Sequence, residues 1–385
     1  MTNPKPSFHD APCQIADRNV LRLITLLRLA LAPHKEDGVP ATDFDSTGLF
    51  ADVTPEAWEQ LYALSCQQNV VAVAADGILL MPPDLRPPLT VWLQWVGATR
   101  VTEDAYIHKY KVLKQLFHFF NQQGIPTLLL KGMTIARLYP HPNHRTMGDI
   151  DIYQFGRWRE ADRLMVRHFG IAVDNSTRHH SKYALCGELI ENHYDIVSGY
   201  SHYGQRSYER MLKQEARQVA AQHGTITSRS GAWATFEALL LLRHAATHFV
   251  ADCITLRHLC DWALFVEHRG SEVDWQRVEE SMRHYRMERF FAALQNTTET
   301  WIGLGTLTAI AHPADKTLEQ RMIHDITAGG YSEPRPESRH RLLGWKWRRL
   351  IANRWKYPVT FGDSFALSVL RNIILHLLRP RSLWH

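Results

Sequence analysis

The amino-acid sequence predicts an α+β protein in which a compact α/β unit lies between two helical regions. Apolar residues recur at helical spacing over much of residues 17–123 and again over about 206–300. Between these regions the pattern changes to short apolar or alternating segments bounded by glycine and proline, which is typical of strands. The 385 residues are 45% hydrophobic and 22% charged, so the composition indicates a globular chain of two or three domains.

The first region, residues 1–123, is expected to be helical. Asp17 is a start signal for its first helix, and Thr54 supplies the N-cap of a later one, followed by a proline in the first turn. A long helical pattern then covers about 89–123 and ends at a glycine.

The α/β unit is expected to cover residues 124–205. Its predicted strands are IPTLLLKG (125–132), DIDIYQF (149–155), SKYALC (181–186) and LIENHYDIV (189–197). The last two flank Gly187 and Glu188 and are expected to form a hairpin. A short helix is predicted at TIARLY, and a longer one over 157–169, ending at Gly170.

The remainder is predicted as a helical domain, residues 206–311, and a C-terminal region, residues 312–385. Residues 312–342 are polar and contain proline, which is typical of a linker. The rest is a basic, Trp-rich tail that includes a predicted helix over 363–378. Residues 335–385 hold eleven Lys and Arg against two acidic residues, although the whole chain carries only +5.

Three roles stay open for this tail. Its helix packs as a final core helix, or it lies on a membrane surface as a peripheral contact, or the basic residues bind nucleic acid. The composition otherwise favours a cytoplasmic protein. The five cysteines form no CxxC pair, the N-terminal residues have no secretory pattern, and no apolar stretch is long enough to span a bilayer.

Asp149 and Asp151 lie one residue apart on a predicted strand, so their side chains face the same way. Two neighbouring carboxylates repel each other unless a cation lies between them, and carboxylate oxygens suit Mg²⁺. A bare pair of this kind is also found as exposed acids on a strand edge. The surrounding residues favour the metal site.

Those residues include candidates for binding phosphate. Lys131 and Gly132 follow a buried strand and precede a short helix, where glycine lets backbone N–H groups approach an anion. Thr134 offers a hydroxyl, and Arg145 can reach phosphate oxygens. A third carboxylate is available on the last strand, where Glu191, His193 and Asp195 alternate onto one face.

The segment LLLKGMTIARLYPHPNHRTMGDIDIY (128–153) resembles the core motif of a group of bacterial nucleotidyltransferase-like proteins with the polymerase β fold. Abortive-infection nucleotidyltransferase toxins have a related Lys-Gly-Gly-Thr to Asp-x-Asp layout. IENHYDIV is similar to the family's acid-x-His-aromatic strand, and LLLLRHAATHF and LRHLCDWALFVE are similar to its helical segments. The resemblance covers residues 125–285 in detail.

The resemblance implies a polymerase β-like core with a small mixed sheet. It implies that Asp149, Asp151 and Glu191 bind Mg²⁺ or Mn²⁺, with Asp195 as the alternative third carboxylate. It also implies that Lys131, Gly132 and Thr134 hold the phosphates of an NTP. The expected reaction transfers a nucleoside monophosphate to an acceptor hydroxyl or phosphate, with Glu191 as general base. The acceptor is a small molecule, a glycan precursor or a protein.

Two departures from the family pattern support an alternative. Met133 stands where the toxins have a second glycine, and most of the superfamily has Gly-Ser in place of Lys131 and Gly132. A bulky Met133 is expected to narrow the phosphate pocket. The alternative is a non-catalytic nucleotide-binding or interaction module that retains the fold.

Several histidines and one charged pair also have open roles. His179 and His180 precede the hairpin and can point at the site. His244 and His248 share a helix face and are expected to be core or hydrogen-bonded residues, with a place in the active-site cleft left open. Arg257 and Asp261 are expected to form a structural pair on one helix, with Arg257 facing the triphosphate as the alternative.

Overall fold

The computed structural model describes residues 17–33, 47–177, 179–197, 202, 204–223, 231–251, 253–309, 313–329, 336 and 338–378. Its α-helices are α1 (Arg18–Leu31), α2 (Thr47–Phe50), α3 (Pro55–Gln67), α4 (Val71–Leu79), α5 (Leu89–Gln122), α6 (Met133–Ala136), α7 (Trp158–Phe169), α8 (Gln205–His223), α9 (Gly231–Ala251), α10 (Leu256–Arg269), α11 (Trp275–His284), α12 (Glu288–Ile302), α13 (Lys316–Thr327), α14 (Arg339–Ala352), α15 (Lys356–Phe361) and α16 (Phe365–Leu378). The strands are β1 (Leu128–Leu129), β2 (Ile150–Tyr153), β3 (His180–Leu185) and β4 (Glu188–His193). The predicted α+β class is confirmed.

The N-terminal helices form as the capping residues predict. The side chain of Asp17 accepts a hydrogen bond from the backbone N–H of Asn19 at the start of α1, and Thr54 caps α3. Helices α1 and α4 pack very closely. A Cβ atom at Gly77 would lie 2.2 Å from the carbonyl oxygen of Leu26, so this contact requires glycine.

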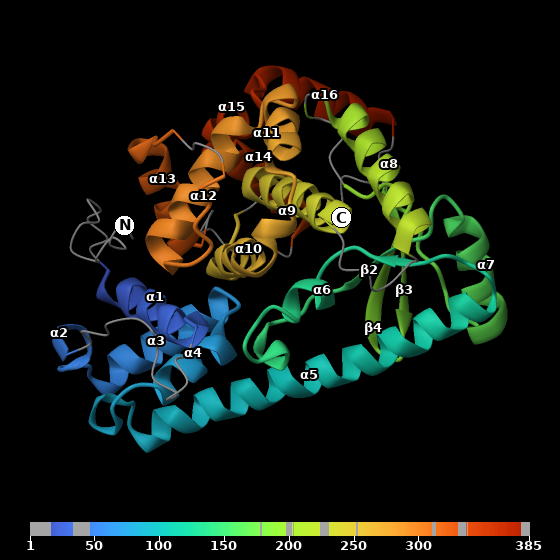
Figure 1. Cartoon of the computed structure of the whole chain (residues 1–385). Helices are drawn as coiled ribbons and strands as arrows, with labels where there is room; N and C mark the ends of the chain where they lie inside the picture. Colours follow the sequence, from blue (N-terminus) through green and yellow to red (C-terminus); the bar gives the residue numbers. More distant parts are fainter. Residues whose placement is uncertain are drawn as a thin grey trace.

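Helix α5 joins the N-terminal helices to the sheet. It has 34 residues, which corresponds to about 50 Å. Its first half packs near α4, while Leu116 and Phe120 in its second half are buried against the sheet in a separate hydrophobic core. Figure 1 shows α5 running beneath both parts of the molecule. The helix therefore fixes the sheet relative to the N-terminal region.

The four strands form one mixed sheet in the order β1-β2-β4-β3. Strands β2 and β4 are parallel, and the chain passes from one to the other through α7 and then β3. The outer pairs, β1 with β2 and β3 with β4, are antiparallel. In this register Asp151 lies beside Glu191, so the sheet brings together two carboxylates that are 40 positions apart.

The predicted hairpin is confirmed as β3 and β4. Its turn residues, Cys186 and Gly187, have φ values of 50° and 83°, the left-handed conformation favoured in two-residue hairpin turns. The register places His180 opposite His193 and Lys182 opposite Glu191. These four side chains therefore share one region of the sheet.

The helices after the sheet enclose the larger hydrophobic core. Helices α9, α10 and α12 contribute many of its fully buried residues, and α1 packs against α12. The expectation of a linker over 312–342 is wrong for α13. Leu318, Met322 and Ile326 on one face of that helix are buried against this core. The predicted domain boundaries themselves stay predictions.

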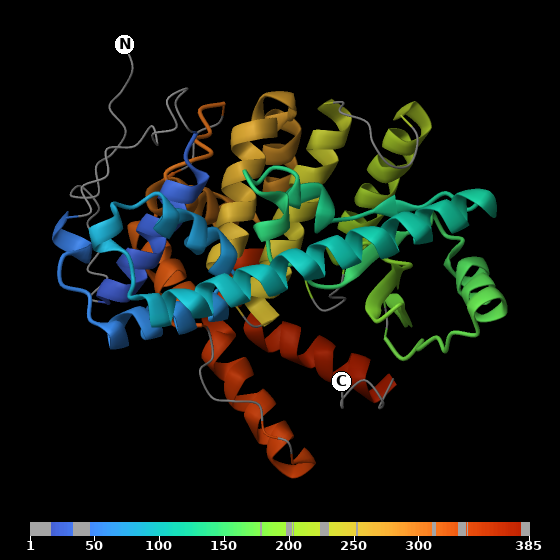
Figure 2. The ribbon, with the colours of Figure 1, turned by 90° about the horizontal axis from the view of Figure 1, so that it is seen from below.

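The last helices extend away from the rest of the molecule. Figure 2 shows α14 and α16 projecting from one side of the helical body. Ser368 on α16 is buried and donates to Asp363, but Leu367 and Leu370 are 54% and 52% exposed. The expectation that this helix packs as a core helix is therefore wrong for its apolar face. No helix in the described ranges has the length and hydropathy to cross a membrane.

Candidate active site

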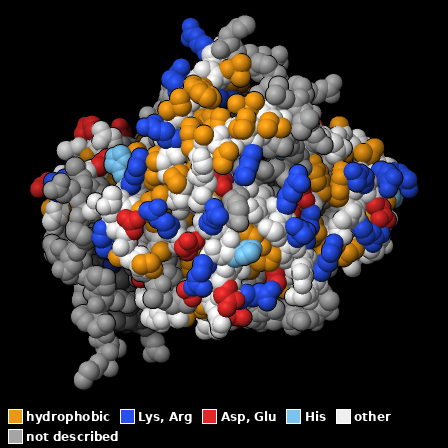
Figure 3. Space-filling model, turned by 90° about the horizontal axis from the view of Figure 1, so that it is seen from above, with side chains coloured by type: hydrophobic (Ala, Val, Ile, Leu, Met, Phe, Trp, Pro, Cys, Tyr) orange, Lys and Arg blue, Asp and Glu red, His pale blue; other side chains and the backbone are white. Residues whose placement is uncertain are grey.

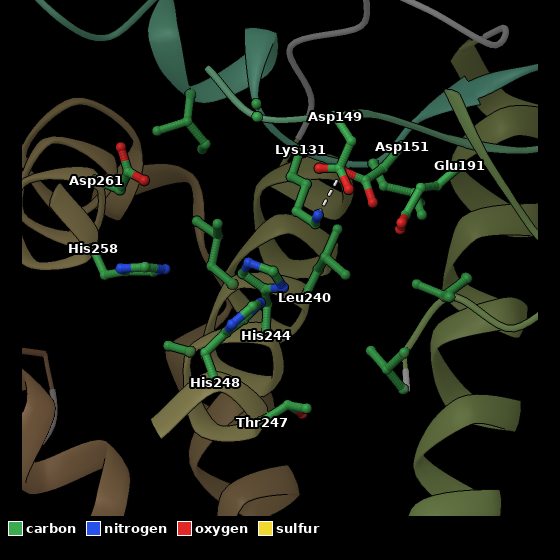
Figure 4. Close-up of a pocket in the computed structure, with 18 of the residues that line it drawn as sticks. Lys131, Asp149, Asp151, Glu191, Leu240, His244, Thr247, His248, His258 and Asp261 are labelled. Carbon is green, nitrogen blue, oxygen red and sulfur yellow. Dashed lines mark hydrogen bonds and ion pairs between the residues drawn. The ribbon is translucent and has the colours of Figure 1, made fainter. Parts of the chain in front are cut away.

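A cavity of about 480 Å³ lies where the sheet meets α9 and α10. One end is lined by Lys131, Asp149, Asp151 and Glu191, from the sheet and the segments before β2 and α6. The other end is lined by side chains of α9 and α10, which include three histidines. Figure 4 shows Lys131 with Asp149, Asp151 and Glu191 at one side of the cavity, and the helical histidines with Asp261 at the other.

Three carboxylates converge at the sheet end of the cavity. Asp149 precedes β2, Asp151 lies on β2, and Glu191 lies on the neighbouring strand β4. One oxygen from each carboxylate lies within 4.8 Å of those of the other two. Burial and the negative charge of Asp151 raise the pKa of Asp149 to about 6. The three predicted metal ligands are thus brought together, and their mutual repulsion is the kind that a divalent cation relieves.

Lys131 neutralises one member of this group. Its Nζ donates to Oδ2 of Asp151 across 2.5 Å. Burial opposes the ionisation of Asp151, but the charges of Lys131 and His193 outweigh burial and lower the pKa of Asp151. Gly132, which follows Lys131, has a φ of 78° and also lines the cavity. The segment after β1 therefore presents a cation and a glycine backbone to the space beside the carboxylates.

Glu191 is held from two sides. Lys182 donates to its Oε1 at 2.7 Å, while Nε2 of His193 lies 3.6 Å from its Oε2. Burial raises the pKa of Glu191, but hydrogen bonds from His193 and Lys182 outweigh burial, so its pKa lies well below the ordinary value. His193 also contacts Asp151, at 2.9 Å. Burial lowers the pKa of His193, but the two carboxylates raise it to about 9.

Sequence reasoning placed His193 on the same face as Glu191 but gave it no role. The alternation of β4 already carries that signal, because residues two apart on a strand face the same way. Its contact with Asp151 depends on the pairing of β2 with β4, which the local pattern does not reveal.

Arg145 lies at the cavity but is engaged by another residue. Its Nε and Nη2 donate to the two carboxylate oxygens of Asp261 on α10, at 2.7 and 2.8 Å. The hydroxyl of Tyr139 donates to Asp261 as well, at 2.7 Å. The predicted phosphate contact of Arg145 is replaced here by a buried bidentate ion pair. The expected pair of Arg257 with Asp261 is also present, at 3.3 Å.

Three other residues lie elsewhere than expected. Thr134 is not among the residues lining the cavity, and its hydroxyl is buried near Glu237 of α9. Met133 is buried in the hydrophobic core around the sheet and does not narrow the cavity. Asp195 lies beyond the end of β4 and accepts from Lys213 at 2.6 Å, outside the cavity. Glu191 is therefore the third carboxylate that the fold brings to the pair.

The helical end of the cavity is formed by His244 and His248 of α9 and His258 of α10. The ring centroids of His244 and His248 lie 4.3 Å apart, and His258 lies within 6.2 Å of both. Burial lowers the pKa values of His244 and His258 well below the ordinary value, so these rings are neutral at pH 7. His244 and His248 therefore line the cavity, which is the second of the two positions considered for them from the sequence.

The charges of the cavity divide it by chemistry. The sheet end suits a divalent cation with a phosphate chain, because carboxylates, a lysine and a glycine backbone meet there. The helical end offers imidazoles and apolar side chains such as Leu240, and its charged residues Arg145, Arg257 and Asp261 are paired with one another. Such a surface suits an uncharged or polar part of a ligand rather than phosphate.

The model of a family described as uncharacterised nucleotidyltransferase matches residues 54–303, which include the whole sheet and every residue of the cavity. No curated protein and no solved structure matches the chain.

Proposed function

The chain belongs to the uncharacterised nucleotidyltransferase family, and from this premise we propose that it transfers a nucleoside monophosphate from an NTP to an acceptor hydroxyl or phosphate. The observation that carries the proposal is the convergence of Asp149, Asp151 and Glu191 beside Lys131 in one cavity. In the reaction an acceptor oxygen bonds to the α-phosphorus, the bond from that phosphorus to the pyrophosphate oxygen breaks, and pyrophosphate leaves.

The residues at the sheet end of the cavity would bind different parts of the substrate complex. Asp149, Asp151 and Glu191 would hold Mg²⁺ or Mn²⁺, which when bound neutralises charge on the triphosphate. Lys131 and the backbone of Gly132 would contact phosphate oxygens, since both line the cavity next to the carboxylates. These assignments keep the site predicted from the sequence, without Thr134 and Arg145.

Arg145 and Glu191 need narrower roles than the sequence implies. Arg145 is committed to Asp261, so we assign it to positioning the segment that leads into β2 rather than to phosphate binding. Glu191 was expected to be a general base. Lys182 contacts its Oε1 at 2.7 Å and His193 lies 3.6 Å from its Oε2, so the carboxylate is held beside the other two acids and we assign it to cation binding.

The alternative function is a nucleotide-binding module without turnover. The position of Met133 was the feature that favoured it, and burial of that side chain in the core around the sheet removes this reason. The acceptor is still to be identified among small molecules, glycan precursors and proteins.

The test is pyrophosphate release from each of the four NTPs, with Mg²⁺ or Mn²⁺, in the presence and absence of cell extract. We expect release with at least one nucleotide, and loss of release in Asp149→Asn at an unchanged melting temperature. Nucleotide binding without release under all these conditions would support the module instead.

We also propose a peripheral membrane contact through the last helices. Half-exposed apolar side chains lie at helical spacing on α14 and α16: Leu343, Trp347, Ile351, Leu367, Leu370, Ile373 and Ile374. We call this set the C-terminal apolar face. Figure 3 shows hydrophobic side chains together with Lys and Arg side chains over the projecting part of the molecule. An apolar face within a region of net +9 matches the interface of an anionic bilayer.

Flotation with vesicles tests this contact. We expect binding to vesicles that contain an anionic phospholipid, weaker binding at high salt, and loss of binding in a Leu370→Glu, Ile373→Glu double variant. Failure to float with any vesicle would overturn the proposal. A dimer in solution that the double variant abolishes, or a nucleic-acid complex formed by the basic residues, would assign the face to those partners.

A further inference from the structure

We propose that His180, Glu191 and His193 form a second cation site, which takes a first-row transition metal such as Zn²⁺. Each of these residues offers one ligand atom, and the three atoms lie within 4.8 Å of one another. The site shares Glu191 with the proposed nucleotide site but uses two nitrogen ligands that Mg²⁺ does not favour. It extends the proposed function and rests on its own ligands.

The hairpin places these ligands together. His180 on β3 is paired directly with His193 on β4, and Glu191 lies two residues before His193 on the same face. Nδ1 of His180 lies 3.2 Å from Oε2 of Glu191, and Nε2 of His193 lies 3.6 Å from that same oxygen. One carboxylate oxygen therefore faces two imidazole nitrogens.

The other oxygen of Glu191 is already used. Lys182 donates to Oε1 at 2.7 Å, which orients the carboxylate and leaves Oε2 toward the histidines. Metal-binding carboxylates are commonly held in this way by an outer partner.

The tautomer of His193 is fixed in the form that binds a metal through Nε2. Its Nδ1 lies 3.0 Å from the carbonyl oxygen of Asp195, and because a carbonyl only accepts, Nδ1 carries hydrogen. Nε2 then faces carboxylate oxygens of Asp151 and Glu191, at 2.9 and 3.6 Å. A lone pair on Nε2 would face oxygen lone pairs, so a proton or a metal ion has to lie between them. A backbone carbonyl on the far nitrogen is the usual outer partner of a metal-binding histidine.

His180 supplies the second, independent observation. Its side chain is only 3% exposed, and neither ring nitrogen makes a hydrogen bond of normal geometry to a described residue, although Nδ1 lies 3.2 Å from Oε2 of Glu191. Buried imidazoles normally have such a partner. A metal ion bound by both Nδ1 and Oε2 of Glu191 would satisfy this nitrogen.

Two imidazoles and one carboxylate are a donor set of Zn²⁺ and related ions. Asp149 and Asp151 add oxygen ligands that suit Mg²⁺ or Mn²⁺, and Oδ1 of Asp151 also lies 2.9 Å from Nε2 of His193. The cavity would then hold two cations of different kinds around one shared carboxylate.

The test uses the full chain, stripped of metal and titrated with Zn²⁺ and with Co²⁺ as a spectroscopic probe. We expect one equivalent of Zn²⁺ to remain after dialysis and visible absorption bands from bound Co²⁺. His180→Asn should weaken Zn²⁺ binding by at least about tenfold, since even outer partners of a ligand have effects of that size. His180→Cys should restore binding and add a sulfur-to-cobalt absorption band, which a merely structural role of His180 would not produce.

Two control variants make the result specific. His248→Asn removes an imidazole from the helical end of the same cavity and should bind Zn²⁺ as the wild type does. Asp149→Asn should lose nucleotide turnover but keep the Co²⁺ spectrum, so failure of the proposed function and failure of this site are distinguishable. Equal Zn²⁺ affinity in the wild type and His180→Asn, with both folded, would overturn the inference.

Discussion

Lys131 and Asp151 form an ion pair across 2.5 Å that links the segment after β1 to β2 at the sheet end of the cavity. In the free protein the proposed phosphate contact and a proposed metal ligand thus neutralise each other. When substrate binds, Asp151 would contact the cation and Lys131 would contact a phosphate, so each charge of the broken ion pair would gain a new partner of opposite charge. The pair therefore marks where the triphosphate and the cation meet.

The first prediction concerns Lys131. Lys131→Met should lower kcat/KM for the NTP by about 100-fold, the effect expected when one charge-stabilising donor is removed. Steady-state kinetics measures it. The matched control is Lys213→Met, because Lys213 has a similar exposure, 23% against 21%, and pairs with Asp195 outside the cavity. A similar loss in both variants would mean that Lys131 has no special part in turnover.

The second prediction concerns the buried pair of Arg145 and Asp261. Arg145→Met should lower the free energy of unfolding by about 3–5 kcal/mol, because Asp261 is then left buried without its bidentate partner. Urea denaturation measures the change. Arg257→Met is the control, since Arg257 makes a single 3.3 Å contact with the same carboxylate, and its loss should be clearly smaller. Equal losses would contradict the assignment of Arg145 as the main partner.

The third prediction concerns Met133. Met133→Ala should lower the free energy of unfolding by about 2–5 kcal/mol, since the side chain is buried in the core around the sheet. Turnover per folded molecule should stay unchanged, because the side chain does not line the cavity. Faster turnover in this variant would show that Met133 restricts the phosphate site after all.

The fourth prediction concerns pH and His193. Because Asp151 and Glu191 raise the pKa of His193 from 6.5 to about 9 in the folded protein, its protonation stabilises the fold. That contribution is fully present below about pH 6.5 and is lost as the pH rises through 9, by up to a few kcal/mol. Denaturation of the metal-free protein between pH 6.5 and 9 measures the slope, and His193→Gln should abolish most of it. Asp149, with a pKa of about 6, titrates mainly below this window.

Much of the sheet and its carboxylates could be predicted from the sequence, because strand alternation and turn residues are local signals. Asp149 and Asp151 face the same cavity as the period of two requires. The choice of Glu191 over Asp195 depended on a family resemblance. The fold explains this choice, because β4 ends at His193 and the side chain of Asp195, beyond that end, pairs with Lys213.

The long-range contacts could not be predicted in the same way. Arg145 and Asp261 are 116 positions apart, and the only partner that local spacing offers to Asp261 is Arg257. Helix α13 was mistaken for part of a linker because its polar face and the flanking prolines dominate the composition. The apolar run of α16 predicts a helix, but whether that helix is covered depends on elements far away in the chain.

The central claim is transfer of the α-phosphoryl group with its nucleoside, and labelled NTPs test it most directly. The protein is incubated with cell extract, a divalent cation and an NTP labelled on either the α- or the γ-phosphorus. We predict that the α-label moves to an acceptor and that the γ-label is released as pyrophosphate. The Asp149→Asn and Asp151→Asn variants should neither transfer the α-label nor release the γ-label. Label reaching an acceptor only from the γ-position, or α-transfer that persists in both variants, would contradict the account.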